Sequence, residues 1–376
     1  MTRTEHRHPP RRTTRAPITA ALGGVVLVAS AMFGTAVGPA AAVVETPVQI
    51  ITRVCGNYVP NPNSIVFTKC SNKYLTGMNL DGVNLDYANL IDANLTGASL
   101  SGASLSFAYM SGTYLSGADL NVATLNGADL SGADLSGATL TDATLTDAWM
   151  YAAWMYGANL TGATLTGAQM FGANLTNTNL TSANLTGANL TDAVLSGANL
   201  TGSSVIPGNV SVPAISADGA TATWTAPTLP IGVTVNSCDH ASGTQFPIGP
   251  TLVTCTVGTE IGTGTGTFTV NVTQAPAFTD TAPVALTGTV GTELTHTFTA
   301  TGTPNPTLTV TGRPTWLTLT NGVVTGTPPV AGSFPFTVTA TNGTAPDATL
   351  QVTVNVTAAP VIDPPATGSL GSIFGS

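Results

Sequence analysis

The sequence carries very little charge, and most of that charge is acidic. Only 7% of the 376 residues are charged, with nine Lys and Arg against eighteen Asp and Glu. No Lys or Arg occurs between Tyr74 and Gly312. Nucleic acids and anionic lipid surfaces are bound through clusters of basic residues. We therefore expect no nucleic-acid partner and no adhesion to anionic membranes.

Histidine is equally scarce, which limits catalysis. Beyond residue 42 the two histidines are His240 and His296, and they lie far apart in the C-terminal half. No general base is identifiable beside a Ser or Thr, and no Gly-rich phosphate loop precedes a helical pattern. The sequence therefore predicts a protein that is not an enzyme and uses no cofactor. One alternative stays open, in which Asp129 and Asp134 are the paired carboxylates of a glycan-hydrolysing surface.

Cysteine is rare as well, with four in the whole chain. They form two local pairs with similar spacings, Cys55 with Cys70 and Cys238 with Cys255. In an oxidising compartment such pairs are expected to form disulfides, each stabilising the fold by ~3 kcal/mol in the chain-entropy model. Neither pair has the tight spacing of zinc ligands, so we expect no metal site there.

The N-terminus has the features of an export signal. Five arginines precede an apolar stretch over residues 18–37, and Ala40 and Ala42 fit a small-x-small cleavage site. We expect residues 1–42 to be removed as a signal peptide, leaving a secreted or cell-wall-associated protein without a membrane span. Because the apolar stretch is close to the length of a membrane-spanning helix, an uncleaved anchor is the alternative.

A strict five-residue period dominates the middle of the chain. From Leu75 to Leu200 every fifth residue is Leu or Met, over 26 repeats, and Ala usually lies two residues earlier. This period gives neither a helical stripe nor one face of a flat strand. It fits a chain that turns one corner per repeat, with each Leu pointing inward. Four corners close a coil of twenty residues, so the repeats form a rod ~30 Å long at the usual strand spacing.

The units of this period, such as "ADLSGADLSGATL" and "ANLTGANLTDAVLSGANLTG", resemble the pentapeptide-repeat family. The resemblance covers residues 75–204 and implies a right-handed, four-sided β-helix. Gly often follows two residues after each inward Leu, where a tight turn needs unusual backbone angles. A solenoid needs its ends covered. We expect residues 43–74, with their disulfide, to cap the start, and the next domain to cover the end.

Residues 148–158, "AWMYAAWMYGA", concentrate aromatic side chains. Met150 and Met155 fall on the inward period, so the residues beside them point outward. One coil earlier the same columns hold aspartates, and two coils earlier they hold tyrosines. The sequence thus predicts an aromatic–acidic patch around one edge of the prism, made of Tyr109, Tyr114, Asp129, Asp134, Trp149, Tyr151, Trp154, Tyr156 and Phe171.

An exposed cluster of rings usually marks a contact site. Trp and Tyr are favoured anchors for protein partners. Rings beside carboxylates equally suit sugars, whose C–H faces stack on the rings while their hydroxyls bond the acids. In a third interpretation the patch packs against the C-terminal domains of its own chain or in a dimer. All three stay open at this point.

From about residue 205 the period gives way to short runs rich in Thr and Val, which are typical of β-strands. Residues 205–275 carry "SCDHASGTQFPIGPT" between a Trp-Thr-Ala-Pro run and Cys255. This segment resembles the hyalin-repeat (HYR) module, which implies an immunoglobulin-like sandwich. It lacks the additional cysteines of many such modules, so its loops can differ from theirs.

Residues 276–358 carry "RPTWLTLTNGVVTGTPPVAGSFPFTVTATNG" and resemble the cadherin-like, immunoglobulin-like repeat of bacterial surface proteins. Cadherin-type modules bind calcium with clustered acids. Here Asp280, Glu293 and Asp347 stand singly, so calcium is an alternative without support in the sequence. The tail, residues 359–376, is rich in Pro, Gly and Ser and is predicted to be disordered.

The expected fold class is all-β: a right-handed quadrilateral β-helix of pentapeptide repeats followed by two immunoglobulin-like β-sandwich modules. The expected function is that of a secreted or cell-surface, non-enzymatic binding and adhesion scaffold whose partner is a protein or a glycan. An alternative follows from the family resemblance, because some pentapeptide-repeat proteins mimic DNA and regulate topoisomerases. The acidic rod is compatible with that role, whereas export is not, because the target is cytoplasmic.

Overall fold

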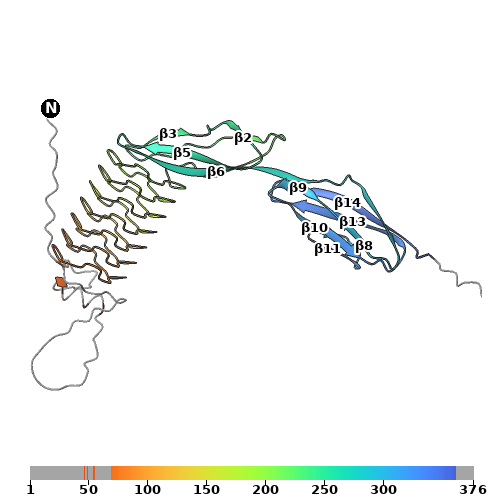
Figure 1. Ribbon diagram of the computed structural model, residues 1–376, viewed down its shortest axis with the longest axis horizontal. Coiled ribbons are helices and arrows are strands. Elements are labelled where there is room, and N and C mark those ends of the chain that lie inside the picture. The colour runs from red at the N-terminus through yellow and green to blue at the C-terminus, as the bar shows by residue number, and fades with distance from the viewer. Residues whose placement is uncertain (1–45, 47–48, 50–53, 56–68, 361–376) are drawn as a thin grey trace, which may run out of the picture.

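The computed structural model describes residues 46, 49, 54, 55 and 69–360. The predicted signal peptide, most of the predicted cap and all but the first two residues of the predicted tail lie outside the described residues. Helical residues among the described ones are Gln49, Val54 and Cys55. None of the described helical segments has the length and hydropathy that a membrane crossing requires. The remainder is built of a coil and fourteen β-strands, which follow one another in a bent, elongated molecule (Figure 1).

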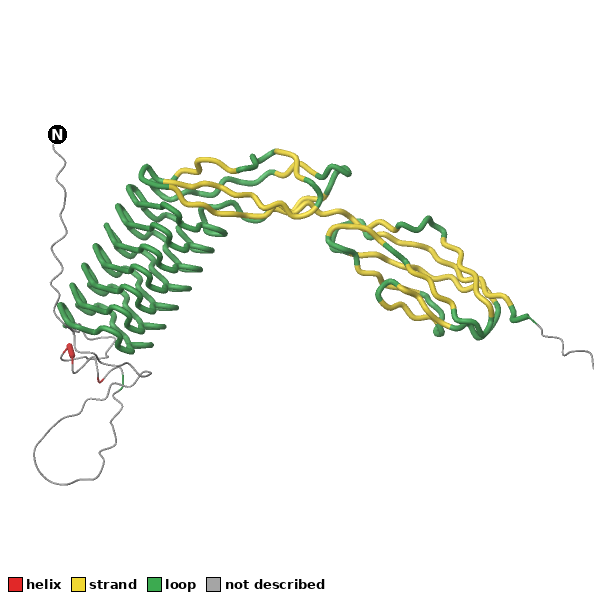
Figure 2. Tube along the Cα trace, viewed as in Figure 1, coloured by secondary structure: helices red, strands yellow, loops and turns green. Residues whose placement is uncertain are grey.

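The coil has the twenty-residue turn that the period predicts. Bridging residues are parallel and lie twenty apart, from Lys69 with Asn89 to Asn179 with Asn199. Backbone hydrogen bonds connect each coil to the next: Leu80 N–H donates to the carbonyl of Ser99 at 2.6 Å, and Ser99 N–H donates back to Met78 at 2.8 Å. The four-sided β-helix is therefore confirmed, and Figure 2 shows its stacked coils.

Each corner of the coil is a hydrogen-bonded turn. The N–H three residues after a buried Leu donates to that Leu's carbonyl, as Met78 does to Leu75 at 3.2 Å. The second residue after the Leu has positive φ in every repeat; Gly77, for example, lies at 64°. Glycine adopts this conformation without a Cβ clash, which explains its frequency here. Val122 takes the same conformation at 51° despite its branched side chain.

The core of the coil is a stack of inward Leu, Met and Ala side chains, nearly all with no exposed surface. Two threonines replace the inward Ala, and both are buried. Their hydroxyls donate to backbone carbonyls one coil below: Thr113 to Leu90 at 2.8 Å and Thr178 to Met155 at 2.7 Å. Both buried hydroxyls are therefore satisfied, which removes the main cost of placing them in the core.

The coil starts earlier than the Leu period predicts. Lys69 already bridges to Asn89, and Cys70 occupies the inward position five residues before Leu75, with no exposed surface. A buried cysteine behaves as a small hydrophobic residue, so it can replace Leu at this place. Cys70 forms a disulfide with Cys55, whose Cα lies 4.7 Å away. The first disulfide thus ties the preceding segment directly to the core of the first coil.

The first sandwich follows the coil. Its main sheet has the order β1-β6-β5-β3, and β2 pairs with β4 in a separate ladder. Cys238 and Cys255 face each other directly across β3 and β5 and form the second disulfide. Its buried core includes Phe246, Phe268 and Val270. The strands are β1 (Val210–Pro213), β2 (Ala220–Ala222), β3 (Thr234–Cys238), β4 (Thr244–Phe246), β5 (Gly249–Gly258) and β6 (Thr263–Phe278).

The second sandwich packs a sheet of order β10-β13-β14-β7 against one of order β11-β12-β8. Phe298, Leu317, Val324 and Phe336 lie in its buried core. Its strands are β7 (Val284–Thr289), β8 (Leu294–Thr297), β9 (Ala300–Thr303), β10 (Thr307–Thr311), β11 (Leu317–Thr320), β12 (Val323–Gly326), β13 (Gly332–Thr341) and β14 (Ala348–Thr357).

Strand β6 connects all three parts. Near its start, Thr265 continues the ladder of the last coil, because Leu200 N–H donates to the Thr265 carbonyl at 2.7 Å. Its middle pairs with β1 and β5, and its end pairs with β9 of the second sandwich. The predicted boundary between residues 275 and 276 therefore falls inside a continuous strand. The first sandwich also covers the end of the coil through Ile231, which bridges to Asn189.

Candidate functional site

The square coil has four faces, which we name A to D in chain order. Each face is defined by its buried central residues, twenty apart, and by the two residues that flank each centre and point outward. The centres run from Cys70 to Leu190 on face A, from Leu75 to Leu195 on face B, from Leu80 to Leu200 on face C and from Leu85 to Leu185 on face D. Because all four faces share the same backbone, their surfaces differ mainly in these flanking residues.

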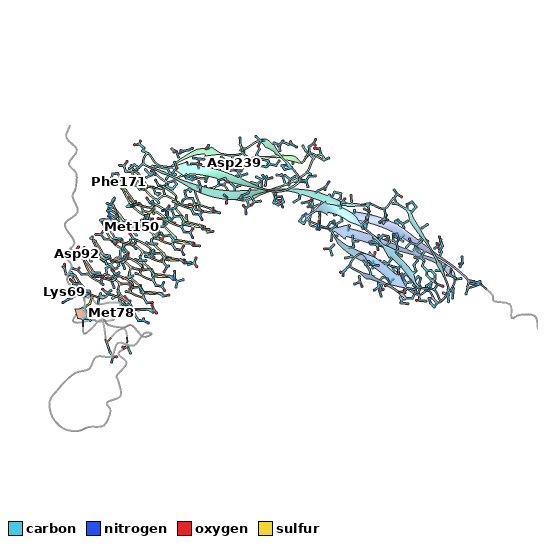
Figure 3. All side chains as sticks on the ribbon, viewed as in Figure 1. Lys69, Met78, Asp92, Met150, Phe171 and Asp239 are labelled. Atoms are coloured by element: carbon cyan, nitrogen blue, oxygen red, sulfur yellow. A yellow bond between two sulfur atoms is a disulfide. The ribbon has the colours of Figure 1, made fainter. Side chains whose placement is uncertain are left out.

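The aromatic–acidic patch lies on faces A and B. Met150 and Met155 are buried centres, as the sequence predicts, and the rings beside them are exposed. Figure 3 places Met150 within the rod and Phe171 toward its sandwich end. The seven rings of the patch have exposed fractions between 40% and 54%: Tyr109, Tyr114, Trp149, Tyr151, Trp154, Tyr156 and Phe171. These values hold with both sandwiches in place, so the rings are not buried against the chain's own C-terminal modules.

The patch contains the same arrangement twice. On face A, Tyr109 bridges to Asp129 and Asp129 bridges to Trp149 in successive coils. On face B, Tyr114, Asp134 and Trp154 repeat this order. A second tyrosine follows each Trp by two residues, Tyr151 on face A and Tyr156 on face B. Each face thus presents a column of Tyr, Asp and Trp parallel to the rod axis, with a further Tyr beside the Trp.

The rings on face A are not coplanar. The Trp149 and Tyr151 ring centroids lie 6.4 Å apart, and the ring planes meet at 67°. This edge-to-face geometry is a favourable aromatic contact. The two rings therefore do not form a flat platform.

Asp129 is fixed within its column. The Ser131 N–H donates to Oδ1 at 3.0 Å, and the Ser111 hydroxyl donates to Oδ2 at 2.5 Å. Partial burial raises the pKa of Asp129, but these hydrogen bonds outweigh burial and hold the pKa below its ordinary value. The side chain is therefore a carboxylate that accepts hydrogen bonds. A glycosidase needs a general acid with a raised pKa, and Asp129 does not supply one.

Asp134 occupies the equivalent place on face B with a looser attachment. The Ser136 N–H donates to its Oδ1 at 3.0 Å, matching the Ser131 bond to Asp129. Ser116, the counterpart of Ser111, donates instead to the Ser136 carbonyl at 3.1 Å. The two columns therefore share their residue types but differ in how firmly the carboxylate is held.

The rod carries a second aromatic contact that the sequence pattern did not predict. Tyr87 and Phe107 stack in successive coils, with ring centroids 5.3 Å apart and planes at 15°. Both occupy the positive-φ corner position that precedes face A, and both are half exposed. Their separation of twenty residues is the signal that could have revealed the pair. The exposed rings of the rod therefore extend around the corner beside face A.

Faces C and D have a different surface. From Asn79 to Ser204 their flanking positions hold Asn, Asp, Ser and Thr alone. On face C these side chains bond to one another along the rod. Asn179 Nδ2 donates to Thr161 Oγ1 at 2.9 Å, and Asn199 Nδ2 donates to Thr181 Oγ1 at 3.1 Å. The polar groups of this ladder are bonded to one another within the protein, whereas the rings of faces A and B are about half exposed.

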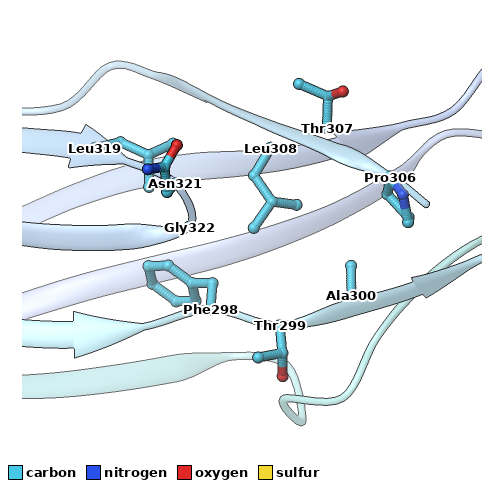
Figure 4. Close-up of a pocket in the computed structure, with 9 residues that line it drawn as sticks. All are labelled: Phe298, Thr299, Ala300, Pro306, Thr307, Leu308, Leu319, Asn321 and Gly322. Carbon is cyan, nitrogen blue, oxygen red and sulfur yellow. The ribbon is translucent and has the colours of Figure 1, made fainter.

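The two sandwiches contain fewer candidate functional side chains than the rod. A cavity of about 460 Å³ in the second sandwich is lined by Phe298, Leu308, Leu319 and Asn321, among others, and by no titratable side chain (Figure 4). His240 lies 3.0 Å from Asp239, whose pKa is lowered mainly by the hydrogen bond from that histidine.

The other histidine, His296, lies 3.8 Å from Asp280. In the described part of the chain no three His, Cys, Asp or Glu residues form a metal-binding group. Asp280, the acid named above as an alternative calcium ligand, therefore has no acidic cluster around it there.

Comparison with known proteins supports the interpretation of the coil. The family model for pentapeptide repeats matches residues 67–97, 79–117, 118–153, 140–181 and 168–204. No curated protein matches the chain.

Two solved pentapeptide-repeat structures are similar to part of the chain. One, from the thylakoid lumen of Arabidopsis thaliana, is 36% identical, with 24% of this chain and 64% of that one covered and a TM-score of 0.24. HetL from the cyanobacterium Nostoc is 34% identical, with 34% and 62% covered and a TM-score of 0.18.

Immunoglobulin domains 1–4 of Sidekick-1 are 19% identical, with 41% of this chain and 48% of that one covered and a TM-score of 0.31. This chain spans less than two thirds of the length of each of these three structures. The family match coincides with the coil, including the segment around Cys70 that precedes the Leu period. The family model therefore identifies pentapeptide repeats over residues 67–204.

Proposed function

We propose that the protein is an extracytoplasmic, non-enzymatic binding scaffold that engages a partner protein or glycan through the aromatic–acidic patch. The observation that carries this proposal is the segregation of side chains around the rod. Faces A and B expose Tyr and Trp in two matching columns, whereas faces C and D hold small polar residues alone. Exposed Trp and Tyr in a cluster are typical of contact surfaces.

The two sandwiches act in this proposal as a spacer that holds the rod away from its point of attachment. Strand β6 runs without a break from the rod into the second sandwich. The junction is reinforced by Asn342, whose Nδ2 donates to the Gln274 carbonyl at 2.8 Å and to the Pro304 carbonyl at 2.7 Å. The resemblance of the two segments to HYR and cadherin-like modules of surface proteins supports an adhesive role.

The extracytoplasmic location is supported by the two disulfides, Cys55–Cys70 and Cys238–Cys255. Such bonds persist in oxidising compartments and are rare in the cytosol. The predicted leader over residues 1–42 points in the same direction. Fractionation of cells into medium, wall and cytosol, followed by detection of the mature chain, tests the location. Recovery mainly from the cytosol in reduced form would contradict it.

To test the binding role, the full mature chain is immobilised and then exposed to cell-wall extracts, glycans and surface proteins. We expect the double variant Trp149→Ala and Trp154→Ala to lose most of the captured partner while its circular dichroism and melting temperature stay close to those of the unaltered protein. Tyr74→Ala is the matched control, because Tyr74 is an exposed ring on face B outside the patch. Equal capture by both variants would reject the patch as the binding surface.

The alternative of a DNA-mimicking topoisomerase regulator finds less support in the surface. A mimic of the phosphate backbone needs acids that follow one another along the rod. The nine aspartates of the coil never occupy the same column in adjacent coils, and Asp129 and Asp134 are separated from other acids by rings above and below. Protection of a topoisomerase by the purified rod, unaffected by Trp149→Ala, would favour this alternative.

Calcium binding by the second sandwich is a separate proposal with a direct test. We expect the melting temperature of the full chain to change by no more than about 1 °C when millimolar calcium replaces a chelator, because a ligand raises it only by binding the folded state and no acidic cluster surrounds Asp280 among the described residues. A rise of several degrees that Asp280→Asn abolishes would show that the module is a calcium site.

A further inference from the structure

The two matching columns of the patch repeat their rings at a defined interval. On face A, Tyr109 and Trp149 are two coils apart, and on face B so are Tyr114 and Trp154. At a strand spacing of ~4.8 Å, two coils correspond to ~9.6 Å along the rod. A carboxylate lies halfway between the rings in each column. A ligand that uses both rings must therefore repeat its contact groups at about this interval, parallel to the rod axis.

Among peptide conformations, polyproline II matches this interval best. Its three residues per turn and ~3.1 Å rise give a repeat of ~9.3 Å. Alternate residues on one face of an extended strand recur every ~6.7 Å, and two turns of α-helix rise ~10.8 Å. Polyproline II segments characteristically dock on surfaces lined with aromatic rings, with prolines seated between them.

The orientation of the rings favours the same ligand over a flat sugar chain. A ribbon-like polysaccharide needs coplanar rings that form a platform. Trp149 and Tyr151 instead meet at 67°, with centroids 6.4 Å apart. An edge-to-face pair offers no such platform, whereas an exposed ring face can still stack on a compact ring such as that of proline. The patch also continues around a right-angled corner of the coil, so its two columns face different directions.

Charge complementarity defines the residue between the prolines. Asp129 is held as a carboxylate by the Ser131 N–H and the Ser111 hydroxyl, and its two oxygens have further lone pairs to offer. No Lys or Arg follows Lys73 until Arg313, so the rod itself supplies no counter-charge near the patch. A guanidinium or ammonium group from a ligand would pair with the carboxylate and pack against the neighbouring rings.

We propose that each of the two columns binds a proline-rich segment in the polyproline II conformation, with a basic residue seated on Asp129 or Asp134. This inference rests on the proposed binding function and specifies its partner as a protein that carries basic, proline-rich stretches. One molecule then has two similar sites on adjacent faces. A partner with two such stretches would bind far more tightly than one with a single stretch, because the second contact becomes intramolecular.

The test is calorimetric titration of the full mature chain with a synthetic peptide of repeated Pro-Pro-Arg and with its Pro-Pro-Ala counterpart. We expect two Pro-Pro-Arg peptides to bind per chain, with an affinity that falls as the salt concentration rises. The affinity for the Pro-Pro-Ala peptide should be at least roughly tenfold lower. Trp149→Ala should reduce the stoichiometry to one, as should Trp154→Ala. Asp129→Asn with Asp134→Asn should remove the preference for arginine, and Tyr74→Ala should change nothing.

A parallel titration uses a β-1,4-linked glucosamine oligomer, the glycan whose charge also suits the patch. Binding of this oligomer through Trp149 and Trp154, without binding of the peptide, would overturn the inference and retain the proposed function as glycan recognition. If a partner is captured through both tryptophans but neither probe binds, the polyproline inference is overturned, whereas the proposed binding function stands. Wild-type affinity for the peptide in the double Trp variant would also overturn it, because the peptide would then bind elsewhere.

Discussion

Faces A and B and faces C and D of the rod are two surfaces built on one scaffold. They share the same turns and inter-coil hydrogen bonds, and both bury stacks of apolar residues, with Met and Cys among the Leu centres of faces A and B. Face C uses its flanking residues to bond to one another, as the Asn179–Thr161 contact shows, and face D carries small polar residues of the same types. Faces A and B place rings there that remain about half exposed. The difference teaches that the core specifies the coil, whereas recognition depends on outward positions that the core does not constrain.

The largest expected effect tests whether the two surfaces share one scaffold. Leu130 is a buried centre on face A, and Leu140 is its counterpart on face C. Each replacement by Ala removes buried methyl groups and leaves a cavity, so we expect each to lower the free energy of unfolding by about 2–5 kcal/mol. The two values should agree to within about 1 kcal/mol. Chemical denaturation of both variants measures them, and a much smaller loss on face A would show that its coil is packed differently.

The five-residue period predicted most of this scaffold correctly, because side-chain direction in a square coil follows from position alone. It therefore predicted that Trp149 and Trp154 point outward. It missed Cys70 as a core residue because the pattern was followed through Leu and Met. It missed the Tyr87–Phe107 stack because both rings stand at the corner position, which was considered for its glycines and not for side chains one coil apart.

The contacts that join the coil to the first sandwich, and the first sandwich to the second, could not be predicted from the sequence. Thr265 and Ile231 extend the ladder of the last coil, yet both come from runs that look like ordinary strands and loops. A strand's pairing partner is set by the three-dimensional packing of distant segments, and the pattern within the strand does not record it. The same reason explains why the continuity of β6 across the predicted boundary at residue 275 was not foreseen.

The next prediction concerns the corners, which also belong to both surfaces. Val122 stands at the corner between faces C and D, and Ala152 at the corner between faces A and B, both with positive φ. The left-handed conformation raises the free energy of a residue with a Cβ by roughly 1–2 kcal/mol relative to glycine, and this penalty is largest for a branched side chain. We expect Val122→Gly to raise the free energy of unfolding by about 1 kcal/mol and Ala152→Gly by less. Urea denaturation compares the two, and destabilisation by Val122→Gly would contradict the argument.

A smaller effect separates the two surfaces directly. On face C, Asn179 takes part in three side-chain hydrogen bonds: it accepts from the Thr181 N–H and hydroxyl and donates to Thr161. On face B, Asn174 is bonded to the Thr176 N–H. We expect Asn179→Ala to lower the free energy of unfolding by about 1 kcal/mol and Asn174→Ala to lower it by about half as much. Each loss is small because water replaces a partly exposed hydrogen bond when it is removed. Thermal melts of the two variants measure the difference, and equal losses would show that the ladder does not stabilise face C.

The smallest expected effect is the pH dependence that Asp129 brings to the patch. Its pKa in the folded protein is lowered, because the hydrogen bonds from Ser111 and Ser131 outweigh partial burial. A carboxyl with a lowered folded pKa contributes stability that is fully present above its unfolded pKa of ~3.9 and is lost as the pH falls through the folded value. The difference in unfolding free energy between wild type and Asp129→Asn should therefore be constant from neutral pH to about pH 5 and should shrink below about pH 4. Urea midpoints measured across this range test the sign, and a difference that grew on acidification would mean that burial dominates. Because the carboxylate persists into acid, the interaction of face A with a basic ligand should likewise persist there, whereas Asn179→Ala on face C removes no ionisable group and should give a stability difference that does not change with pH.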